Sequence, residues 1–251
     1  MTALRLDRVR KRFGGVEAIT DLSFVVAPGQ VTGLIGPNGA GKTTAVNLVT
    51  GILAPTAGRI LIGERSIGGL APHQVARAGV ARTFQTVRLL REASVLDNIV
   101  VGFHRHEQTS LPANLLGFPA VWRERRAFRR QALELLARFA MAEYAEVPAG
   151  GLSYGHQRRV EIMRALATGP AFLLFDEPVA GMNDVEAAEL GRSVREVARA
   201  GVGILLIEHN MRFVMDICDI VHVIDSGRLI ASGSPAAVSS DAAVLAAYLG
   251  A

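Results

Sequence analysis

A glycine-rich segment near the N-terminus combines residue types that bind phosphate. It reads Gly36-Pro37-Asn38-Gly39-Ala40-Gly41-Lys42-Thr43, follows an apolar run at Val31–Ile35, and precedes a predicted helix that ends near Gly51. Glycines let the backbone curve so that consecutive N–H groups and a helix N-terminus face an anion. In this strand–loop–helix context, Lys42 would contact the β- and γ-phosphates of a nucleotide, and the Thr43 hydroxyl would bind Mg²⁺.

Two adjacent carboxylates, Asp176 and Glu177, follow the apolar run Phe172–Phe175. Sheets of α/β proteins hold their ligands at the carboxyl ends of strands, and successive strand residues point to opposite faces. The two acids can therefore take different roles. Asp176 fits the carboxylate on the Mg²⁺ side, directly or through water, and Glu177 fits the group that polarises an attacking water. A helix cap made by Asp-Glu-Pro would explain Pro178 but not the apolar strand before it.

Two further polar residues gain meaning only from their place in this set. Gln85 falls where the expected sheet gives way to a helical lobe, so it could contact the metal and the lytic water. His209 follows the apolar run Gly203–Ile207, about 30 residues after Glu177, and can donate a hydrogen bond to a γ-phosphate. Taken alone, a glutamine indicates nothing and a histidine at a strand end is more often structural.

A third segment, Leu152-Ser153-Tyr154-Gly155-His156-Gln157, lies between the glycine-rich loop and the two carboxylates. Serine is a favoured helix N-cap, and the N–H groups of a helix N-terminus attract anions. We therefore expect Ser153 to cap a helix whose first turn, with Gly155, presents N–H groups to a phosphate.

These residues need a sheet to position them. Alternating or continuous apolar runs predict strands near Leu4–Val9, Leu22–Val26, Val31–Ile35, Arg59–Ile62, Phe172–Phe175, Gly203–Ile207 and Val221–Ile224. Period-3.6 patterns predict helices at Lys42–Val49, Gln131–Ala140, Asp184–Arg199 and Ala242–Leu249. Strands that alternate with helices around a phosphate loop indicate an α/β fold with a largely parallel sheet.

The middle of the chain is predicted to be a separate helical lobe. We expect residues 1–86 and 168–251 to form one α/β domain and residues 87–167 to form the inserted lobe. In the expected helix Gln131–Ala140, three apolar residues would share one face: Leu133, Leu136 and Ala140. Trp122 and Phe128 would anchor the packing of the less regular stretch that begins at His104.

Composition excludes several classes of protein. The chain has 251 residues, of which 50% are hydrophobic and 20% charged, so it can form a large core and is not disordered as a whole. Its one cysteine, Cys218, excludes an internal disulfide and is expected in the core. Met1–Arg12 has no hydrophobic stretch and apolar runs such as Val202–Ile207 are shorter than a membrane span, so we expect a cytoplasmic protein that reaches a membrane through a partner.

The formal net charge is +4, and the arginines are scattered except for one cluster. This cluster favours a solvated or partner-facing helix over a nucleic-acid surface. Its members are Arg123, Arg125, Arg126, Arg129 and Arg130.

In this order, the motifs resemble those of an ATP-binding subunit of ABC transporters over essentially the whole chain. The resemblance implies a P-loop NTPase (RecA-like) core, an N-terminal antiparallel β portion and an inserted α-helical lobe that carries the family signature. It implies ATP and Mg²⁺ as ligands, with Phe13 as a platform on which adenine stacks. It also implies a head-to-tail sandwich of two subunits, in which Ser153 and Gly155 of one contact the γ-phosphate held by the other.

The resemblance assigns a role to each candidate site residue. The expected catalytic residues are Glu177, His209 and Gln85, and the expected metal ligands are Thr43, Gln85 and Asp176. ATP would be bound by Phe13, Gly36, Asn38, Gly39, Ala40, Gly41, Lys42, Thr43 and Thr44.

Three segments depart from the family pattern. Tyr154 and His156 stand where the common signature Leu-Ser-Gly-Gly-Gln has other residues. Ala180–Asn183 replaces the usual Ser-Ala-Leu-Asp, so the role of the family's aspartate at this loop does not carry over. Phe13 replaces the commoner tyrosine but keeps the ring face.

Finer motifs resemble the ATPases of Liv-type importers of branched-chain amino acids. They are Arg12–Gly15, Ala81–Gln85, Leu152–Arg159, Ile207–Met211 and Ala247–Gly250. This likeness implies a motor subunit at the cytoplasmic face of the inner membrane, coupled to movement of two permeases through the Gln85–Asn98 region. It also implies a second ABC ATPase, which forms a homo- or heterodimer, and a periplasmic substrate-binding protein. A Liv-like importer of urea or amides, and a lipid-extracting or other ABC exporter, remain alternatives.

Other classes of ABC protein fit less well. Repair ATPases need a long coiled coil between the phosphate loop and the signature, but here about 110 residues separate them without sustained heptads. Translation factors of this kind carry two cassettes in one chain, and this chain has one. A regulator that only binds nucleotide would not need both Glu177 and His209.

Overall fold

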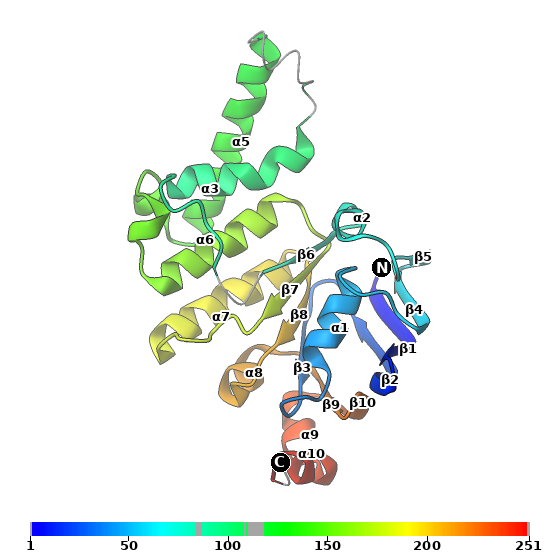
Figure 1. The fold of residues 1–251 in the computed structure, drawn as a ribbon. Coiled ribbons are helices and arrows are strands. Elements are labelled where there is room, and N and C mark those ends of the chain that lie inside the picture. The colour runs from blue at the N-terminus through cyan, green and yellow to red at the C-terminus, as the bar shows by residue number, and fades with distance from the viewer. Residues whose placement is uncertain (1, 84–86, 108, 110–117, 250–251) are drawn as a thin grey trace. The chain divides into compact units, whose positions relative to one another are not determined.

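The structure, a computed structural model, describes residues 2–83, 87–107, 109 and 118–249 (Figure 1). The chain divides into two compact units. The first, here called the sheet unit, comprises Met1–Gln85 and Ala171–Ala251, and the second, the helical unit, comprises Thr86–Pro170.

The sheet unit is built on one mixed sheet, whose order within the described residues is β5-β4-β1-β2-β10-β9-β3-β8-β7-β6. Neighbouring strands from β9 to β6 pair in parallel, whereas β5, β4, β1 and β2 pair antiparallel. This arrangement confirms the predicted α/β fold with its N-terminal antiparallel portion. The strands are β1 (Leu4–Phe13), β2 (Val16–Val26), β3 (Val31–Ile35), β4 (Ala57–Ile62), β5 (Arg65–Ser66), β6 (Val80–Arg82), β7 (Phe172–Asp176), β8 (Gly203–Ile207), β9 (Ile220–Asp225) and β10 (Arg228–Gly233).

Helices of the sheet unit connect these strands and bury their apolar faces against the sheet. The core next to the phosphate loop contains Leu34 of β3, Val46 of the following helix and Ile224 of β9. Cys218 is buried, as predicted. The helices are α1 (Lys42–Val49), α2 (Pro72–Arg77), α7 (Asp184–Arg199), α8 (Met211–Ile217), α9 (Pro235–Ser239) and α10 (Ala242–Leu249).

The first hairpin is longer than its alternation pattern predicts. β1 and β2 pair from Leu4 opposite Val26 to Phe13 opposite Val16, with register shifts after Leu6. Arg8 has a φ of +48°, so the strand bulges there and the side chains change face. The period-two pattern is therefore lost in the sequence although the pairing continues.

Over its described residues, 87–107, 109 and 118–170, the helical unit forms the helices α3 (Val95–Gly102), α5 (Pro119–Arg138) and α6 (Tyr154–Ala167). Short 3₁₀ turns lie between them: η1 (Phe103–His106), η2 (Ala142–Tyr144) and η3 (Ala149–Gly151). None of the helices traced in residues 2–83, 87–107 and 118–249 combines the length and apolar character of a membrane span.

The expected apolar face of this unit was wrong. Helix α5 runs from Pro119 and includes the arginine cluster, and its second half buries Ala132 and Leu136, while Leu133 is 42% exposed. Ala140 lies beyond the helix with a φ of +53°. The face with Leu133 and the face with Ala132 both satisfy helical spacing. The face with Ala132 is the buried one, and Phe139, after the helix end, is buried as well.

The predicted aromatic anchors behave differently from each other. Phe128 stacks on Phe103, with ring centroids 5.4 Å apart, as expected of a packing residue. Trp122 is 59% exposed, so it is not a core anchor.

Candidate active site

The phosphate loop, Gly36–Gly41, connects the fully buried strand β3 to helix α1. Gly41 is the N-cap residue of α1 and has a φ of +103°, a conformation that side chains with a Cβ rarely adopt. A Cβ at this position would lie 2.9 Å from the carbonyl oxygen of Ala18. Glycine at this position therefore allows the loop to run directly into the N-terminus of α1, and such a helix N-terminus favours an anion.

The turn between β9 and β10 is hydrogen-bonded to the phosphate loop. Gly227 donates its N–H to the carbonyl of Ala40 at 3.0 Å and accepts the N–H of Thr20 at 2.9 Å. The loop is thus tied to two strands of the sheet. Asn38, Gly39 and Thr43 remain exposed, as residues that bind a ligand must be.

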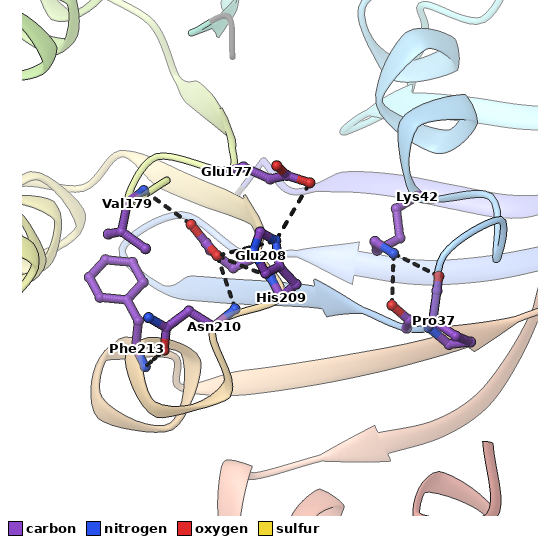
Figure 2. Close-up of polar contacts among 9 residues, drawn as sticks. Pro37, Lys42, Glu177, Val179, Glu208, His209, Asn210 and Phe213 are labelled. Carbon is purple, nitrogen blue, oxygen red and sulfur yellow. Dashed lines mark hydrogen bonds and ion pairs between the residues drawn. The ribbon is translucent and has the colours of Figure 1, made fainter. Parts of the chain in front are cut away.

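Lys42 lies in the curve of the loop, where its Nζ donates to the carbonyl oxygens of Gly36 at 2.7 Å and Pro37 at 2.8 Å (Figure 2). Burial lowers the pKa of Lys42, and the negative charge of Glu177 partly opposes that shift. The ammonium group is thus held among the phosphate-loop carbonyls, with the Glu177 carboxylate close enough to affect its titration.

Asp176 and Glu177 lie in different surroundings, as their adjacent positions on a strand predict. The Asp176 side chain is 2% exposed and forms an ion pair with Arg82 of β6, Nη2 to Oδ2, at 2.6 Å. Arg82 also donates from Nη1 to Oδ1 of Asn47 in α1 at 2.8 Å. Neither Arg82 nor Asn47 was predicted as a site residue from the sequence. The signal that could have indicated Arg82 was a charged residue in a strand next to the one that ends in the buried carboxylate.

Glu177 directly follows the last residue of β7, and 32% of its side chain is exposed. Its φ of +49° is unusual for a residue with a side chain, and its N–H donates to the carbonyl of Ile207 at 2.9 Å. This backbone conformation turns the chain out of β7 directly after Asp176. Such strain persists where the surrounding structure holds it, and it is common at functional sites.

His209 lies beside Glu177, as Figure 2 shows, with Nδ1 3.6 Å from Oε1 of Glu177 and 64% of its side chain exposed. It follows the end of β8, which pairs in parallel with β7. The two residues come together because parallel neighbours end at the same edge of the sheet.

Glu208, between β8 and His209, is a further buried acidic residue of the site that was not predicted from the sequence. Its side chain is fully buried, and its carboxylate accepts three backbone N–H groups, those of Val179 at 3.1 Å, His209 at 3.0 Å and Asn210 at 3.1 Å. An acidic residue at the end of an entirely apolar strand was a visible signal, because buried carboxylates need such partners.

Phe13, at the end of β1, is 46% exposed. Lys11 Nζ lies 4.9 Å from the centroid of its ring, a cation–π distance. The ring is therefore accessible for stacking, as the proposed adenine platform requires.

The remaining predicted residues lie elsewhere in the chain. In the helical unit, Ser153 is the N-cap of α6, and its hydroxyl accepts the N–H of His156 at 3.3 Å, while Gly155 is buried in the first turn. Gln85 lies outside the described residues. The sheet unit by itself therefore brings together Lys42, Asp176, Glu177 and His209.

The available donors fit Mg²⁺ bound together with a nucleotide. No group of three His, Cys, Asp or Glu side chains converges on one point in residues 2–83, 87–107, 109 and 118–249, so a metal cage built by such side chains is not seen there. Mg²⁺ at nucleotide sites is held by one or two protein oxygens together with phosphates and waters. Thr43 and Asp176 offer such oxygens.

Comparisons with known proteins agree with this geometry. Residues 19–180 match the family model described as ABC transporter, and residues 228–251 match the model described as branched-chain amino acid ATP-binding cassette transporter. A crystal structure of an ATP-binding cassette of an ABC transporter in its ADP conformation superimposes with a TM-score of 0.85 at 32% identity, covering 100% of both chains.

Curated relatives match along nearly the whole chain. The high-affinity branched-chain amino acid transport ATP-binding protein LivG of Salmonella typhimurium is 42% identical over 98% of this chain and 97% of its own length. The lipopolysaccharide export system ATP-binding protein LptB of Escherichia coli is 34% identical, over 100% of this chain and 98% of its own. Because the family model covers more than half of the sequence and the identity extends from end to end, the chain belongs to the ABC transporter family and is one of its nucleotide-binding ATPases.

Proposed function

We propose that this chain is the ATP-hydrolysing motor subunit of an importer of branched-chain or related amino acids. The observation that carries the proposal is the 42% identity to LivG along nearly the full length of both chains. The match of residues 228–251 to the branched-chain amino acid model supports it, because this segment forms β10, α9 and α10 beyond the general ABC match.

The geometry supports a division of roles within one nucleotide site. The backbone N–H groups of the phosphate loop and Lys42 would bind the phosphates of ATP, with Thr44 following in α1, and Phe13 would stack on adenine. Thr43, Asp176 and Gln85 would hold Mg²⁺, which supplies charge neutralisation at the phosphates when bound.

The pair at the strand ends would act on water and the γ-phosphate. Glu177 has an accessible carboxylate, which suits a group that orients or deprotonates the attacking water. His209 is mostly exposed and lies 3.6 Å from Glu177, so one side chain can contact the water while the other donates to the γ-phosphate.

A second ABC ATPase would complete the site. The first turn of α6, capped by Ser153, offers N–H groups with a favourable helix dipole for an anion. In a head-to-tail dimer, Ser153 and Gly155 of one subunit would contact the γ-phosphate bound by the other. The dimer would close on ATP and open after hydrolysis.

The permeases would contact the segment that precedes α3. Leu90 is 53% exposed, and buried Asn98 holds its backbone by accepting the Leu90 N–H at 2.8 Å and donating to the Leu90 carbonyl at 2.9 Å. Arg88 and Arg91, both exposed, flank this leucine. An apolar side chain between two cations on a fixed backbone suits a short permease helix. The assembly would lie at the cytoplasmic face of the inner membrane, with a periplasmic binding protein supplying the cargo.

The 34% identity to LptB favours one second candidate, an ATPase of a lipid-exporting system. A pull-down separates the two. Tagged Glu177→Gln protein, isolated from solubilised native membranes with ATP and Mg²⁺, should recover two multi-span permeases and a second ABC ATPase. Recovery of a lipid-exporting complex would reject import. Reconstituted importer should then take up radiolabelled leucine, and uptake of urea or an amide instead would reassign the cargo.

A further inference from the structure

Glu208 links the two loops that carry Glu177 and His209. Strands β7 and β8 pair in register up to Asp176 opposite Ile207, and the N–H of Glu177 donates to Ile207 at 2.9 Å. Beyond this point the two segments that follow β7 and β8 are no longer joined by the hydrogen-bond ladder of the sheet. The position of each catalytic candidate then depends on other contacts.

The Glu208 carboxylate supplies those contacts with one oxygen for each loop, as Figure 2 shows. Oε1 accepts the N–H of Val179, two residues after Glu177, at 3.1 Å. Oε2 accepts the N–H groups of His209 at 3.0 Å and Asn210 at 3.1 Å. Both oxygens are therefore acceptors for N–H groups on opposite sides of the gap between the loops.

The burial of this carboxylate makes the link stiff. The Glu208 side chain is fully buried and Val179 is 6% exposed, so water competes poorly for the hydrogen bond between them. Losing this bond would leave a buried N–H group unsatisfied, which is costly. Glu177 also needs support, because its φ of +49° is strained.

We propose that Glu208 is a positioning residue that sets the separation of Glu177 and His209, and so aligns the attacking water with the γ-phosphate. This inference rests on the roles proposed above for those two residues. Glu208 itself does not touch nucleotide or water in this scheme. It acts through the backbone of the two loops and through the His209 ring, whose Nδ1 lies 4.0 Å from Oε2 of Glu208.

The two conservative replacements remove different parts of the link. In Glu208→Asp the shorter side chain can still accept N–H groups one and two residues ahead, as aspartate does in turns, but it loses its reach to Val179. In Glu208→Gln one oxygen becomes an NH₂ donor, which cannot accept a backbone N–H. Asn210→Ala is the matched control, because it removes the side chain that caps α8 in the same loop and leaves in place the backbone N–H of residue 210, which Glu208 accepts.

Steady-state ATP hydrolysis by the reconstituted importer, with its second ATPase present, and equilibrium ATP binding by this chain test the proposal. Glu208→Asp and Glu208→Gln should lower kcat roughly 10- to 100-fold, because small displacements of catalytic groups cost this much. Their Kd for ATP should stay within about twofold of wild type, because the phosphate loop is untouched. Asn210→Ala should lower the melting temperature with kcat within about twofold.

A double-mutant cycle with His209→Ala identifies the route of the effect. If Glu208 acts through His209 and Glu177, Glu208→Asp should reduce the residual rate of His209→Ala by less than about threefold. A full multiplicative loss would overturn the proposal, as would equal losses in Glu208→Asp and Asn210→Ala. If Glu208→Gln fails to fold, Glu208→Asp alone decides.

Failure of the proposed roles is visible separately. Wild-type hydrolysis by Glu177→Gln would overturn the catalytic assignment and this inference with it. Wild-type hydrolysis by Glu208→Asp, when Glu177→Gln is inactive, would overturn only the inference. Neither result depends on which cargo the transporter moves.

Discussion

Oε1 of Glu177 lies 3.6 Å from Nδ1 of His209, although 32 residues separate them in the sequence. The two side chains follow the ends of adjacent parallel strands, β7 and β8. Each is partly exposed, whereas the neighbouring carboxylates Asp176 and Glu208 are buried. At this sheet edge, therefore, Glu177 and His209 are accessible to solvent, whereas the buried carboxylates bind backbone N–H groups and Arg82.

Glu177→Gln should abolish ATP hydrolysis but not ATP binding. The amide keeps the size of the side chain and removes its ability to accept a proton, and loss of a general base typically slows a reaction about 100-fold or more. Hydrolysis should be measured by phosphate release and binding by a fluorescent ATP analogue. Glu143→Gln, at an exposed position of the helical unit, is the control. Hydrolysis within tenfold of wild type would contradict the assigned role.

Arg82→Ala should destabilise the sheet unit by about 3–5 kcal/mol, because it removes the charge partner of a buried carboxylate. Urea unfolding measures the effect. Arg59→Ala is a close control, since Arg59 and Asp7 also lie 2.6 Å apart but the arginine side chain is 63% exposed. Exposed pairs contribute less than about 1 kcal/mol. Equal losses in the two variants would show that burial of the Arg82–Asp176 pair does not govern its contribution.

Gly41→Ala should weaken ATP binding and lower stability. The new Cβ would lie 2.8 Å from Cδ1 of Ile19 and 2.9 Å from the oxygen of Ala18, in addition to the strain of a φ of +103°. Gly201→Ala is matched in backbone conformation, with a φ of +99°, but its Cβ meets nothing within 4 Å. Strain alone costs about 1–3 kcal/mol.

A nucleotide titration and thermal unfolding of both glycine variants separate the two effects. Gly201→Ala should lose stability and keep its affinity for ATP. Gly41→Ala should lose both. Unchanged affinity in Gly41→Ala would mean that the loop accommodates the methyl group without moving its N–H groups.

Charge reversal at the proposed permease contact should uncouple hydrolysis from transport. The double variant Arg88→Glu with Arg91→Glu should keep ATP binding within about twofold and lose most leucine uptake in reconstituted importer, because like charges at an interface cost binding. Arg123→Glu with Arg125→Glu, also exposed in the helical unit, changes the charge equally elsewhere. Transport unaffected by the first pair would exclude this surface as the coupling site.

Local signals explain what could be predicted of the fold. Strand β3, the phosphate loop and helix α1 follow one another in the sequence, so the glycine spacing and the flanking apolar runs predict this strand–loop–helix segment. The same holds for α7, whose predicted range, Asp184–Arg199, is the observed one. Register shifts in β1 removed the alternation on which strand prediction depends, and α5 offered two helical faces of similar apolar character.

The sequence by itself determined the family and the fold class, because the motifs that carry them are short and each is continuous in the chain. Only the tertiary structure decided the partners of the buried charges. Arg82 reaches Asp176 across 94 residues, and Glu208 reaches Val179 across 29. Such pairs depend on which strands are neighbours and in what register, which no local periodicity encodes. The physical reason is that a charged side chain removed from water must be paired or hydrogen-bonded to be stable, and which side chains are removed from water is decided only when the sheet folds.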